Sequence, residues 1–407
     1  MQLKLIAMAV AGVLAAPAFA QSNVVVYGRI SEAYSTFNHD SVGLREDQSS
    51  TSRLGFKGTE EISSDLSAFF ALEHRFTADN GNTSGPSTTG AAPGFNTSSG
   101  GTFWGEKAYF GLQSKAAGSV SFGRISSPAY SGMGGNFDAF GGDTIISNPG
   151  FGKRGRVSNY FENGGRYDSP NWGGFDFTVA ASTGEGLGNS TPQSSSGASA
   201  TAGEKKAAYG LLAHFSPGNL RTEFSWQHDV SGDNGRGGLN PAGGSTITTT
   251  APNNPYNTTA FAVSYDFGVM SLAVSTARGK GYNTKVGNQI VGGLGVSDSW
   301  VQSSMVNVVA PIGAHSIHFQ YDFKKEKGPG DLNGGKAFYA PSYRAWGLGY
   351  WYSLSKRTTF ELNTSFAQQR STSFKAASGT ITTGFASGTG DTFSSQKGLE
   401  LVLNHDF

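Results

Sequence analysis

The sequence predicts an all-β protein: a 16-stranded antiparallel transmembrane β-barrel with an inward-folded third loop. Three observations support this prediction. Segments of about ten residues alternate apolar and polar side chains, the number of such segments is even, and short turns alternate with long polar connections. A tilted strand of about ten residues is long enough to cross the hydrocarbon layer of a membrane.

The N-terminal segment has the pattern of a secretory signal peptide. Lys4 supplies a positive start, residues 5–16 are apolar, and Ala18-Phe19-Ala20 forms a small-residue cleavage site. A membrane anchor needs about 20 apolar residues, whereas polar residues begin here at Gln21. We expect a cleaved signal peptide over residues 1–20 and one β-barrel domain over residues 21–407.

The composition excludes several classes of protein. Lys4 is one of 30 basic residues, and without it 29 basic residues face 29 acidic ones, so nothing indicates a nucleic-acid partner. The chain contains no cysteine, so no disulfide framework stabilises it. No later stretch reaches 18 consecutive apolar residues, so the mature chain is either soluble or a barrel.

Period-two alternation is clearest in three segments, in which one face is apolar and the other polar or charged. The apolar faces carry Ile317, Phe319, Tyr321 and Phe323, then Leu220, Thr222, Phe224 and Trp226, then Phe360, Leu362 and Phe366. One such strand also fits a soluble sandwich, but an even set of sixteen suits a closed outer-membrane barrel. The sixteen predicted strands begin near Val24, Ser52, Leu66, Phe103, Ser119, Arg156, Phe175, Ala207, Leu220, Tyr256, Val269, Trp300, His315, Tyr343, Thr358 and Gln396.

The connections between strands alternate in length. Short turns are predicted at residues 61–65, 169–174, 216–219, 266–268 and 353–357, and long polar segments at 79–101, 185–204, 231–255 and 371–395. Linkers between domains would not recur after every second strand, whereas short periplasmic turns opposite long outer loops are typical of outer-membrane barrels. A closed sheet pairs every backbone group in hydrocarbon, and a barrel of this size encloses an aqueous channel.

Signals for an enzyme or a metal site are weak. The chain contains no Gly-x-Ser-x-Gly, no Walker-type phosphate loop and no His-Glu-x-x-His. His315 and His318 are three residues apart on a strand, so their side chains point to opposite faces and cannot chelate one metal. We expect no catalytic residues, no metal and no cofactor.

The connection after the fifth strand differs from the others. Residues 125–155 show no alternation and contain eight glycines, yet they include five large apolar residues that a free linker does not need: Phe137, Phe140, Ile145, Ile146 and Phe151. We expect this third loop to fold against the inner wall and narrow the lumen. The alternative is an outer loop packed on the rim of the barrel.

Motifs spread over nearly the whole mature chain are similar to those of a known family. They are VVVYGRI (24–30), SRLGFKGTEE (52–61), AYFGL (108–112), VSFGR (120–124), RYDSPNWGGF (166–175), LSKRT (354–358) and the terminal Phe407. Jointly they resemble the Gram-negative trimeric general porins, in particular the betaproteobacterial type. The resemblance implies an outer-membrane homotrimer in which the third loop constricts each pore, with basic residues of the wall facing acidic residues of the loop.

The resemblance also implies which charges line the constriction. Arg53 occupies the basic constriction position of the family, and Lys57 shares its face. The full set is Arg29, Arg53, Lys57, Arg156 and Arg166 on the wall, Glu106 before the fourth strand, and Asp138 and Asp143 on the loop. For each of them the alternative is a solvated residue of the lumen or of a loop.

Two departures from the family pattern reduce the expected selectivity. Strongly anion-selective members have a second basic residue just before the fourth strand, where this chain has Glu106 followed by Lys107. A third basic position is matched by Tyr160. We therefore expect a modest preference for anions.

The expected function is passive diffusion of small hydrophilic solutes and inorganic ions through a water-filled channel in the outer membrane. The expected partners are these solutes, outer-membrane lipid and two further copies of the chain, with no nucleic acid. A channel specific for one solute is an alternative, because specificity depends on a few lumen side chains. An outer-membrane barrel enzyme, such as a lipase or protease, is a second one.

Overall fold

The computed structural model describes most of the strands and their short connections. The described residues are 23–37, 43–45, 52–79, 81, 103–132, 137–141, 145, 160–183, 207–229, 256–280, 285–286, 289–290, 300–327, 343–376, 379–382 and 391–407. The predicted signal peptide and the predicted long connections at 185–204 and 231–255 lie outside these ranges, as does most of the connection at 79–101.

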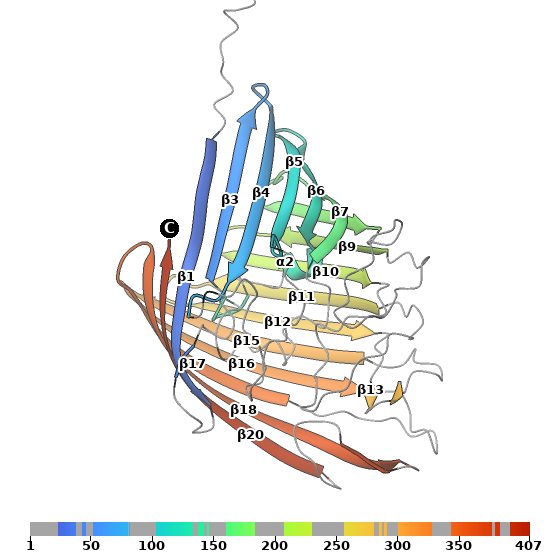
Figure 1. Cartoon of the computed structure of the whole chain (residues 1–407), viewed down its shortest axis with the longest axis vertical. Coiled ribbons are helices and arrows are strands. Elements are labelled where there is room, and N and C mark those ends of the chain that lie inside the picture. Colours follow the sequence, from blue (N-terminus) through green and yellow to red (C-terminus); the bar gives the residue numbers. More distant parts are fainter. Residues whose placement is uncertain are drawn as a thin grey trace, which may run out of the picture.

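Sixteen antiparallel strands of the described chain form a closed barrel (Figure 1). Each barrel strand pairs with its neighbours along the chain, and the last strand pairs with the first. The barrel strands are β1 (Asn23–Phe37), β3 (Ser52–Glu61), β4 (Leu66–Phe76), β5 (Lys107–Ser114), β6 (Gly118–Ser126), β7 (Tyr160–Asp168), β8 (Phe175–Ser182), β9 (Ala208–Phe215), β10 (Leu220–Asp229), β11 (Tyr256–Asp266), β12 (Ser271–Lys280), β15 (Trp300–Ile312), β16 (His315–Lys327), β17 (Tyr343–Ser353), β18 (Thr358–Ala376) and β20 (Asp391–Asp406).

Short additional elements accompany the barrel. β2 (Gly43–Arg45) pairs with β1 and β19 (Gly379–Thr382) pairs with β18, each near the end of its partner that precedes a long connection. β13 (Lys285–Val286) and β14 (Gln289–Ile290) pair only with each other in the described chain. The helix α2 (Pro128–Gly132) follows β6. No helix in the described ranges is both long enough and apolar enough to span a membrane.

The barrel closes between its two terminal strands. The β1–β20 ladder runs from the Arg29 and Asp406 pair to the Phe37 and Gly398 pair. The terminal Phe407 extends this closure, because its backbone N–H and C=O each form a 3.1 Å hydrogen bond with the backbone of Gly28. Closure leaves neither strand with an open edge, as a sheet in hydrocarbon requires.

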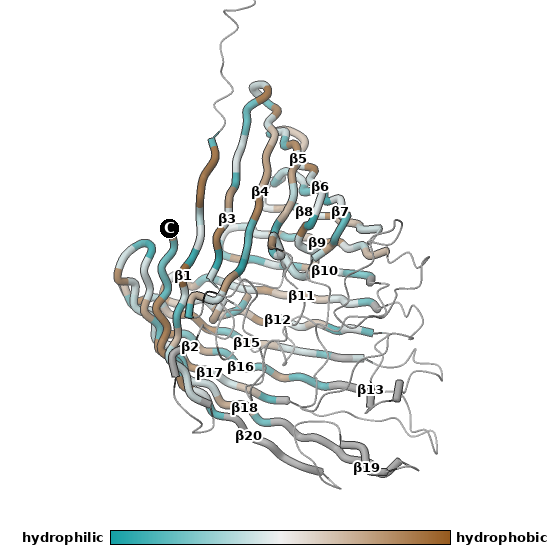
Figure 2. Tube along the Cα trace, viewed as in Figure 1, coloured by the Kyte–Doolittle hydropathy of each residue, from teal (hydrophilic) through white to brown (hydrophobic). Residues whose placement is uncertain are grey.

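The two faces of the barrel differ in polarity, and Figure 2 shows the alternation along the strands. On β16, Ile317 and Phe319 are 43% and 38% exposed, whereas His318 and Gln320 between and beside them are buried at 5% and 0%. β10 and β18 repeat the pattern, with Phe224 and Leu362 on the outside. The predicted alternation is therefore confirmed, and the exposed apolar face is the one that meets lipid.

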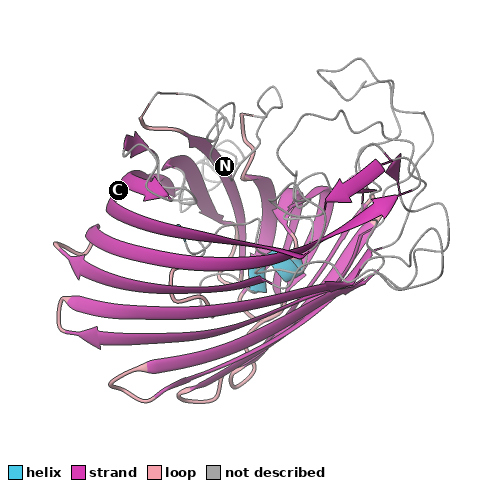
Figure 3. Cartoon of the chain, turned by 90° about the horizontal axis from the view of Figure 1, so that it is seen from below, coloured by secondary structure: helices cyan, strands magenta, loops and turns pink. Residues whose placement is uncertain are grey.

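Short turns gather at one end of the barrel (Figure 3). All five predicted short turns are confirmed, and the described chain adds two more at residues 115–117 and 313–314. The turn at 313–314 contains only two residues, and Gly313 there has φ of 64°, a conformation that glycine adopts without strain.

Two predicted boundaries are wrong. Phe103 does not begin a strand, since β5 begins at Lys107. The ring of Phe103 instead stacks on His74, with ring centroids 4.2 Å apart. β20 begins at Asp391 instead of near Gln396, since its backbone continues to pair with β18 up to the Thr372 and Asp391 pair. Backbone pairing does not require alternation of apolar and polar side chains, so the polar sequence of residues 371–395 concealed it. The predicted strand start at Arg156 lies outside the described residues, and β7 is described from Tyr160.

The turn between β3 and β4 is tied to the next turn by one carboxylate. Asp65 accepts a hydrogen bond from the Ser114 hydroxyl at 2.7 Å and another from the Ala116 N–H at 3.2 Å. The bond from Ser114 is the largest of the effects that hold the pKa of Asp65 below its ordinary value. The ionised form is therefore the one that stabilises this pair of turns.

We predict that Asp65→Ala destabilises the barrel at neutral pH and has a smaller effect in acid. The carboxylate contributes above the unfolded-state pKa of about 3.9, and its contribution is lost as the pH falls through the lower folded-state pKa. Thermal unfolding of parent and variant, followed by gel mobility at neutral pH and at a pH below both values, measures this. A difference in midpoint that stays constant across this range would contradict the assignment.

Candidate functional site in the barrel lumen

The third loop lies against inward-facing side chains of distant strands. The Ala129 N–H donates to Gln227 Oε1 of β10 at 3.3 Å, and the Ile145 N–H donates to Glu400 Oε2 of β20 at 3.2 Å. Gln227 and Glu400 are fully buried on the inner face of the barrel. The described parts of the loop therefore lie inside the barrel, where Figure 3 shows the helix among the strands.

The middle of the loop is held by β15. Asn307 accepts a hydrogen bond from the Ala139 N–H at 3.1 Å and donates one to the Phe137 carbonyl at 2.5 Å. On the neighbouring strand β16, His318 Nδ1 lies 2.5 Å from the Ala139 carbonyl oxygen. Two wall side chains thus pair with three polar groups of the loop backbone between Phe137 and Ala139.

Apolar side chains anchor the same segment. Phe137 packs with Ala262 of β11 and Ala273 of β12. Phe140 packs with Ala139 and Ile145, and Val309 and Trp351 cover this cluster. Phe137, Phe140 and Ile145 are all buried, as the prediction of an inward-folded loop requires, whereas Ile146 and Phe151 lie outside the described residues.

Close approach of the loop requires a glycine in the wall. A Cβ added to Gly349 of β17 would overlap the ring of Phe140 and Oδ1 of Asn363. The same holds at the end of α2, where a Cβ on Gly132 would overlap the carboxylate of Glu223 and the side chain of Leu212. Loop and wall are thus in direct contact at Gly132 and at Phe140.

A group of basic side chains lies on the wall formed by the first four barrel strands. This basic wall consists of Arg29 on β1, Arg53 and Lys57 on β3, Arg75 on β4 and Lys107 on β5. Arg29 is directly opposite Arg53 in the β1–β3 ladder, and Arg53 is directly opposite Arg75 in the β3–β4 ladder. Three guanidinium groups therefore form one row across three strands.

Glu73 is the central acid of the basic wall. It is 2% exposed and pairs with Lys107 at 2.7 Å and with Arg53 at 4.0 Å. It also accepts a hydrogen bond from the Tyr27 hydroxyl at 2.9 Å. Lys57 lies 5.1 Å above the ring of the same tyrosine. One buried carboxylate thus fixes the positions of several wall cations.

Glu106 pairs with a basic residue of the same wall. Its carboxylate lies 3.0 Å from Arg75 Nε and also accepts a hydrogen bond from the Tyr160 hydroxyl. Tyr160 in turn lies 3.5 Å from the hydroxyl of Tyr130 on α2. The two residues that depart from the family pattern are therefore in contact, and they connect the wall to the third loop.

Two further predicted wall residues, Arg29 and Arg166, form ion pairs with acids other than Glu73 and Glu106. Arg29 makes a two-pronged contact with Asp406 at 2.6 and 3.1 Å. Arg166 pairs with Asp168 at 2.6 Å and also donates to the Ser131 hydroxyl of α2 at 2.9 Å. Arg166 therefore lies beside the loop, whereas Arg29 lies at the barrel closure.

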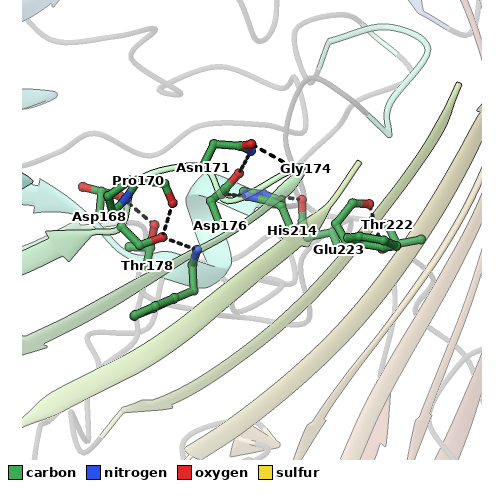
Figure 4. Close-up of polar contacts among 12 residues, drawn as sticks. Asp168, Pro170, Asn171, Gly174, Asp176, Thr178, His214, Thr222 and Glu223 are labelled. Carbon is green, nitrogen blue, oxygen red and sulfur yellow. Dashed lines mark hydrogen bonds and ion pairs between the residues drawn. The ribbon is translucent and has the colours of Figure 1, made fainter. Parts of the chain in front are cut away.

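A chain of polar contacts continues along the wall from β7 to β10 (Figure 4). Thr178 donates to Asp168 at 2.6 Å. His214 lies between two carboxylates, with Nδ1 2.8 Å from Asp176 and Nε2 3.4 Å from Glu223. Because both ring nitrogens face an acceptor, the site suits the imidazolium ion.

The remaining part of the inner wall carries several buried acids. Glu223, Asp322, Glu361 and Glu400 come from β10, β16, β18 and β20. Glu361 accepts a hydrogen bond from Asn404 at 2.6 Å, and Asn363 lies within 3.5 Å of both Glu361 and Glu400. Glu400 thus supports the loop from β20, the strand that pairs with β1 of the basic wall.

The structure places some predicted residues differently from the expectation of a lumen charge. Asp138 is buried at 7%, and its carboxylate accepts a hydrogen bond from the Phe140 N–H at 2.9 Å, which shapes the loop backbone. Asp143 and Arg156 lie outside the described residues. His315 and His318 point to opposite faces, as predicted: His315 contacts Tyr350 on the outer face and His318 contacts the loop. The described residues contain no group of three acids or histidines placed to hold a metal.

Sequence reasoning did not select Glu73 and Arg75 for the site. Ala71 faces inward, and Glu73 and Arg75 follow it at every second position of the strand, so they share its face. Alternation alone could have placed them in the lumen. Their pairing with Lys107 and Glu106 depends on the register between β4 and β5 and on the path of the chain before β5.

We predict that Asn307→Leu loosens the third loop. The variant leaves the Ala139 N–H and the Phe137 carbonyl without their wall partner, and each such buried group costs about 1–3 kcal/mol. Open-channel current noise should rise. Gln302→Leu is the matched control, since it removes an amide from the outer face of the same strand. Equal noise in the two variants would show that Asn307 does not hold the loop.

Comparisons with known proteins agree with this architecture. The family described as Gram-negative porin matches residues 7–373. An outer membrane porin protein of Bordetella pertussis is 28% identical over 347 residues, which cover 82% of this chain and 80% of that protein. A second relative, outer membrane porin protein 32 of Delftia acidovorans, is 40% identical over 90 residues, covering 21% of this chain and 25% of the relative.

Solved structures share the fold. The anion-selective porin from Comamonas acidovorans superposes with a TM-score of 0.63 at 20% identity, over 95% of this chain and 100% of that one. The trimer form of the outer membrane protein OmpT of Vibrio cholerae gives a TM-score of 0.59 at 13% identity, over 95% and 99% of the two chains. The family match over most of the chain and the closed 16-stranded barrel together show that this chain belongs to the Gram-negative porins, the channel-forming proteins of the outer membrane.

Proposed function

We propose that this porin is a passive diffusion channel for small hydrophilic solutes and inorganic ions with a modest preference for anions. Its narrowest section is formed by the basic wall and the third loop. The observation that carries this proposal is the position of the loop. Phe137 packs on β11 and β12, which lie eight strands away from β3 and β4, half of the way around a 16-stranded barrel.

The charges around the passage support a modest anion preference. The basic wall has five cations, and the acids paired with them are Glu73, Glu106 and Asp406, which leaves an excess of two positive charges. Rings of fixed charge set the selectivity of channels. Glu106, which pairs with Arg75, is already counted in this balance, and the other buried acids of the inner wall reduce the excess further.

Roles follow for the remaining charged residues. Arg166 is proposed to hold α2 at the wall through Ser131, and Asp138 to set the backbone turn at Phe140. Asp143 is proposed as a further charge of the constriction loop, residues 125–155, and Arg156 as a further charge of the wall. Each of these roles rests on position and on the family resemblance.

The assembly and processing of the chain are proposed from the same family. We assign a homotrimer, in line with the trimer form of the structurally similar protein of Vibrio cholerae. Residues 1–20 are assigned as a signal peptide removed on export. We assign no catalytic activity, since the chain belongs to a family of channels. A channel specific for one solute is the second candidate, supported by the many polar side chains on the inner wall.

The proposed function predicts conductance without a bound activator. Purified protein inserted into a planar bilayer should give stepwise, ohmic current increases, and liposomes that contain it should swell in small sugars at rates that fall with sugar size. A swelling rate that saturates for one sugar would favour the solute-specific alternative. Folded protein with neither current nor swelling would refute a diffusion channel.

We predict that Arg53→Gln lowers the ratio of chloride to potassium permeability by up to about fivefold. This factor corresponds to about 1 kcal/mol, the interaction energy of two unit charges 4 Å apart in water. The Debye length falls from about 30 Å at 0.01 M salt to about 3 Å at 1 M, so the change should be large in dilute salt and fade in concentrated salt. Reversal potentials in salt gradients measure it. Lys356→Gln, in a turn away from the wall, is the control. An unchanged reversal potential in dilute salt would remove Arg53 from the selectivity site.

A further inference from the structure

An apolar strip of the inner wall lies directly beside a lysine of the basic wall. Ala71 of β4 is opposite Lys57 of β3 on one side and opposite Tyr109 of β5 on the other. The three strands lie side by side in Figure 1. Neighbouring strands are about 4.8 Å apart, so two larger side chains flank a single methyl group. We refer to Lys57, Phe69, Ala71 and Tyr109 as the Ala71 site.

Alternation places the Ala71 site on the lumen side of the barrel. Ala71 shares its face of β4 with Glu73, the central acid of the basic wall. Tyr109 shares its face of β5 with Lys107, whereas Phe110 next to it is 65% exposed on the outer face. The side chains of the site are therefore within reach of a solute in the channel.

Two aromatic rings border the site. Phe69, two residues before Ala71, packs edge to face on Tyr109, with ring centroids 6.3 Å apart and ring planes at 75°. Gly111 leaves room for this pair, because a Cβ there would lie 2.7 Å from the ring of Phe69. Both rings are half-buried, so part of each faces the lumen.

The ring of Tyr109 is also supported by the neighbouring strands. It packs against the buried cluster of Ile125, Phe161 and Ala180. A ring that is already held in place loses little freedom when a solute binds. A further aromatic ring can therefore join the pair of Phe69 and Tyr109 in the offset or edge-to-face geometry that such rings prefer.

Lys57 provides a charge that no acid balances. It is exposed, and in the described chain its printed contact is with the ring of Tyr27, 5.1 Å from its ammonium group. The other four cations of the basic wall each lie beside Glu73, Glu106 or Asp406. An exposed ammonium group without an acid attracts an anion.

The acid next to the site is already neutralised. Glu73 is 2% exposed, pairs with Lys107 and Arg53, and accepts a hydrogen bond from Tyr27. Its charge is therefore balanced within the wall, and the positive charge of Lys57 remains available to a solute.

The described anchors of the third loop lie on other strands. The helix α2 packs against β8 to β11, and Phe137 packs on β11 and β12. These contacts do not involve β3, β4 or β5. The inner wall residues Asn307 and Glu400 are paired with loop atoms, whereas the described part of the loop does not use the Ala71 site in this way.

We propose that the Ala71 site binds small aromatic carboxylates, such as benzoate, during their passage; this inference rests on the proposed diffusion function. The carboxylate of the solute pairs with the Lys57 ammonium, and its ring lies over Ala71 against Tyr109 and Phe69. An exposed ion pair contributes little by itself, so the ring contact is needed for binding. The basic wall in turn excludes neutral aromatic solutes from this preference.

The test is partial block of single-channel current by potassium benzoate at neutral pH. Benzoate should lower the potassium chloride current in a saturable way. Acetate, which has only the carboxylate, and benzyl alcohol, which has only the ring, should each bind at least about fivefold more weakly. Cyclohexanecarboxylate has the charge and the size without the aromatic ring, and should bind about threefold more weakly.

Variants separate the two halves of the site. Lys57→Gln and Tyr109→Leu should each weaken the benzoate block about fivefold, measured against the current of the same variant without benzoate. Tyr109→Phe keeps the ring and should bind benzoate as the parent does. Phe110→Leu changes the next residue of the same strand on the outer face, and is the matched control.

Three outcomes would overturn the proposal. Benzoate could block no better than acetate, cyclohexanecarboxylate could block as well as benzoate, or Lys57→Gln could leave the block unchanged. If Tyr109→Leu forms no channels, Lys57→Gln and the series of solutes still decide. In each of these outcomes the parent conducts potassium chloride, so the diffusion function stands. Folded parent protein without any current would instead refute the diffusion function and this inference with it.

Discussion

The rest of the structure depends on the pairing of backbone polar groups in a medium without water. An unpaired N–H or C=O in hydrocarbon is costly, so a membrane-spanning sheet has no stable edge. Here the ladder between β1 and β20 removes the edge, and the terminal Phe407 completes it through two hydrogen bonds with Gly28. Closure then determines which side chains face lipid and which face the lumen. The number of strands in the closed sheet sets the width of the interior.

A wide interior creates a second requirement, because sixteen strands leave a space that wall side chains cannot fill. The third loop occupies part of it. Wall amides and carboxylates such as Asn307 and Glu400 pair with the loop backbone, and Gly349 leaves room for the ring of Phe140. These buried polar residues face the lumen, yet their partners are loop atoms. A side chain that points into the barrel is therefore not necessarily part of the solute path.

Charge follows the same division of the wall. The cations of β1, β3, β4 and β5 share few acids, with Glu73 serving two of them, whereas the strands that carry the loop are supplied with acids. The modest anion preference that we propose is the small difference between these two sets of charges. The outer surface has a separate pattern, in which Arg278 and Arg344 lie over aromatic rings.

The sequence by itself determined the closed barrel, its sixteen strands and the faces of those strands, because strict alternation is a local consequence of the pleated backbone. It also identified the third loop as a segment with apolar anchors such as Phe137 and Phe140. Only the tertiary structure decided that Asp138 is buried in a turn, that Glu106 pairs with Arg75, and that Glu73 is the central acid of the basic wall. Those contacts join residues from different strands or from loops without a repeating pattern. They depend on register and on the path of the chain, which local periodicity does not encode.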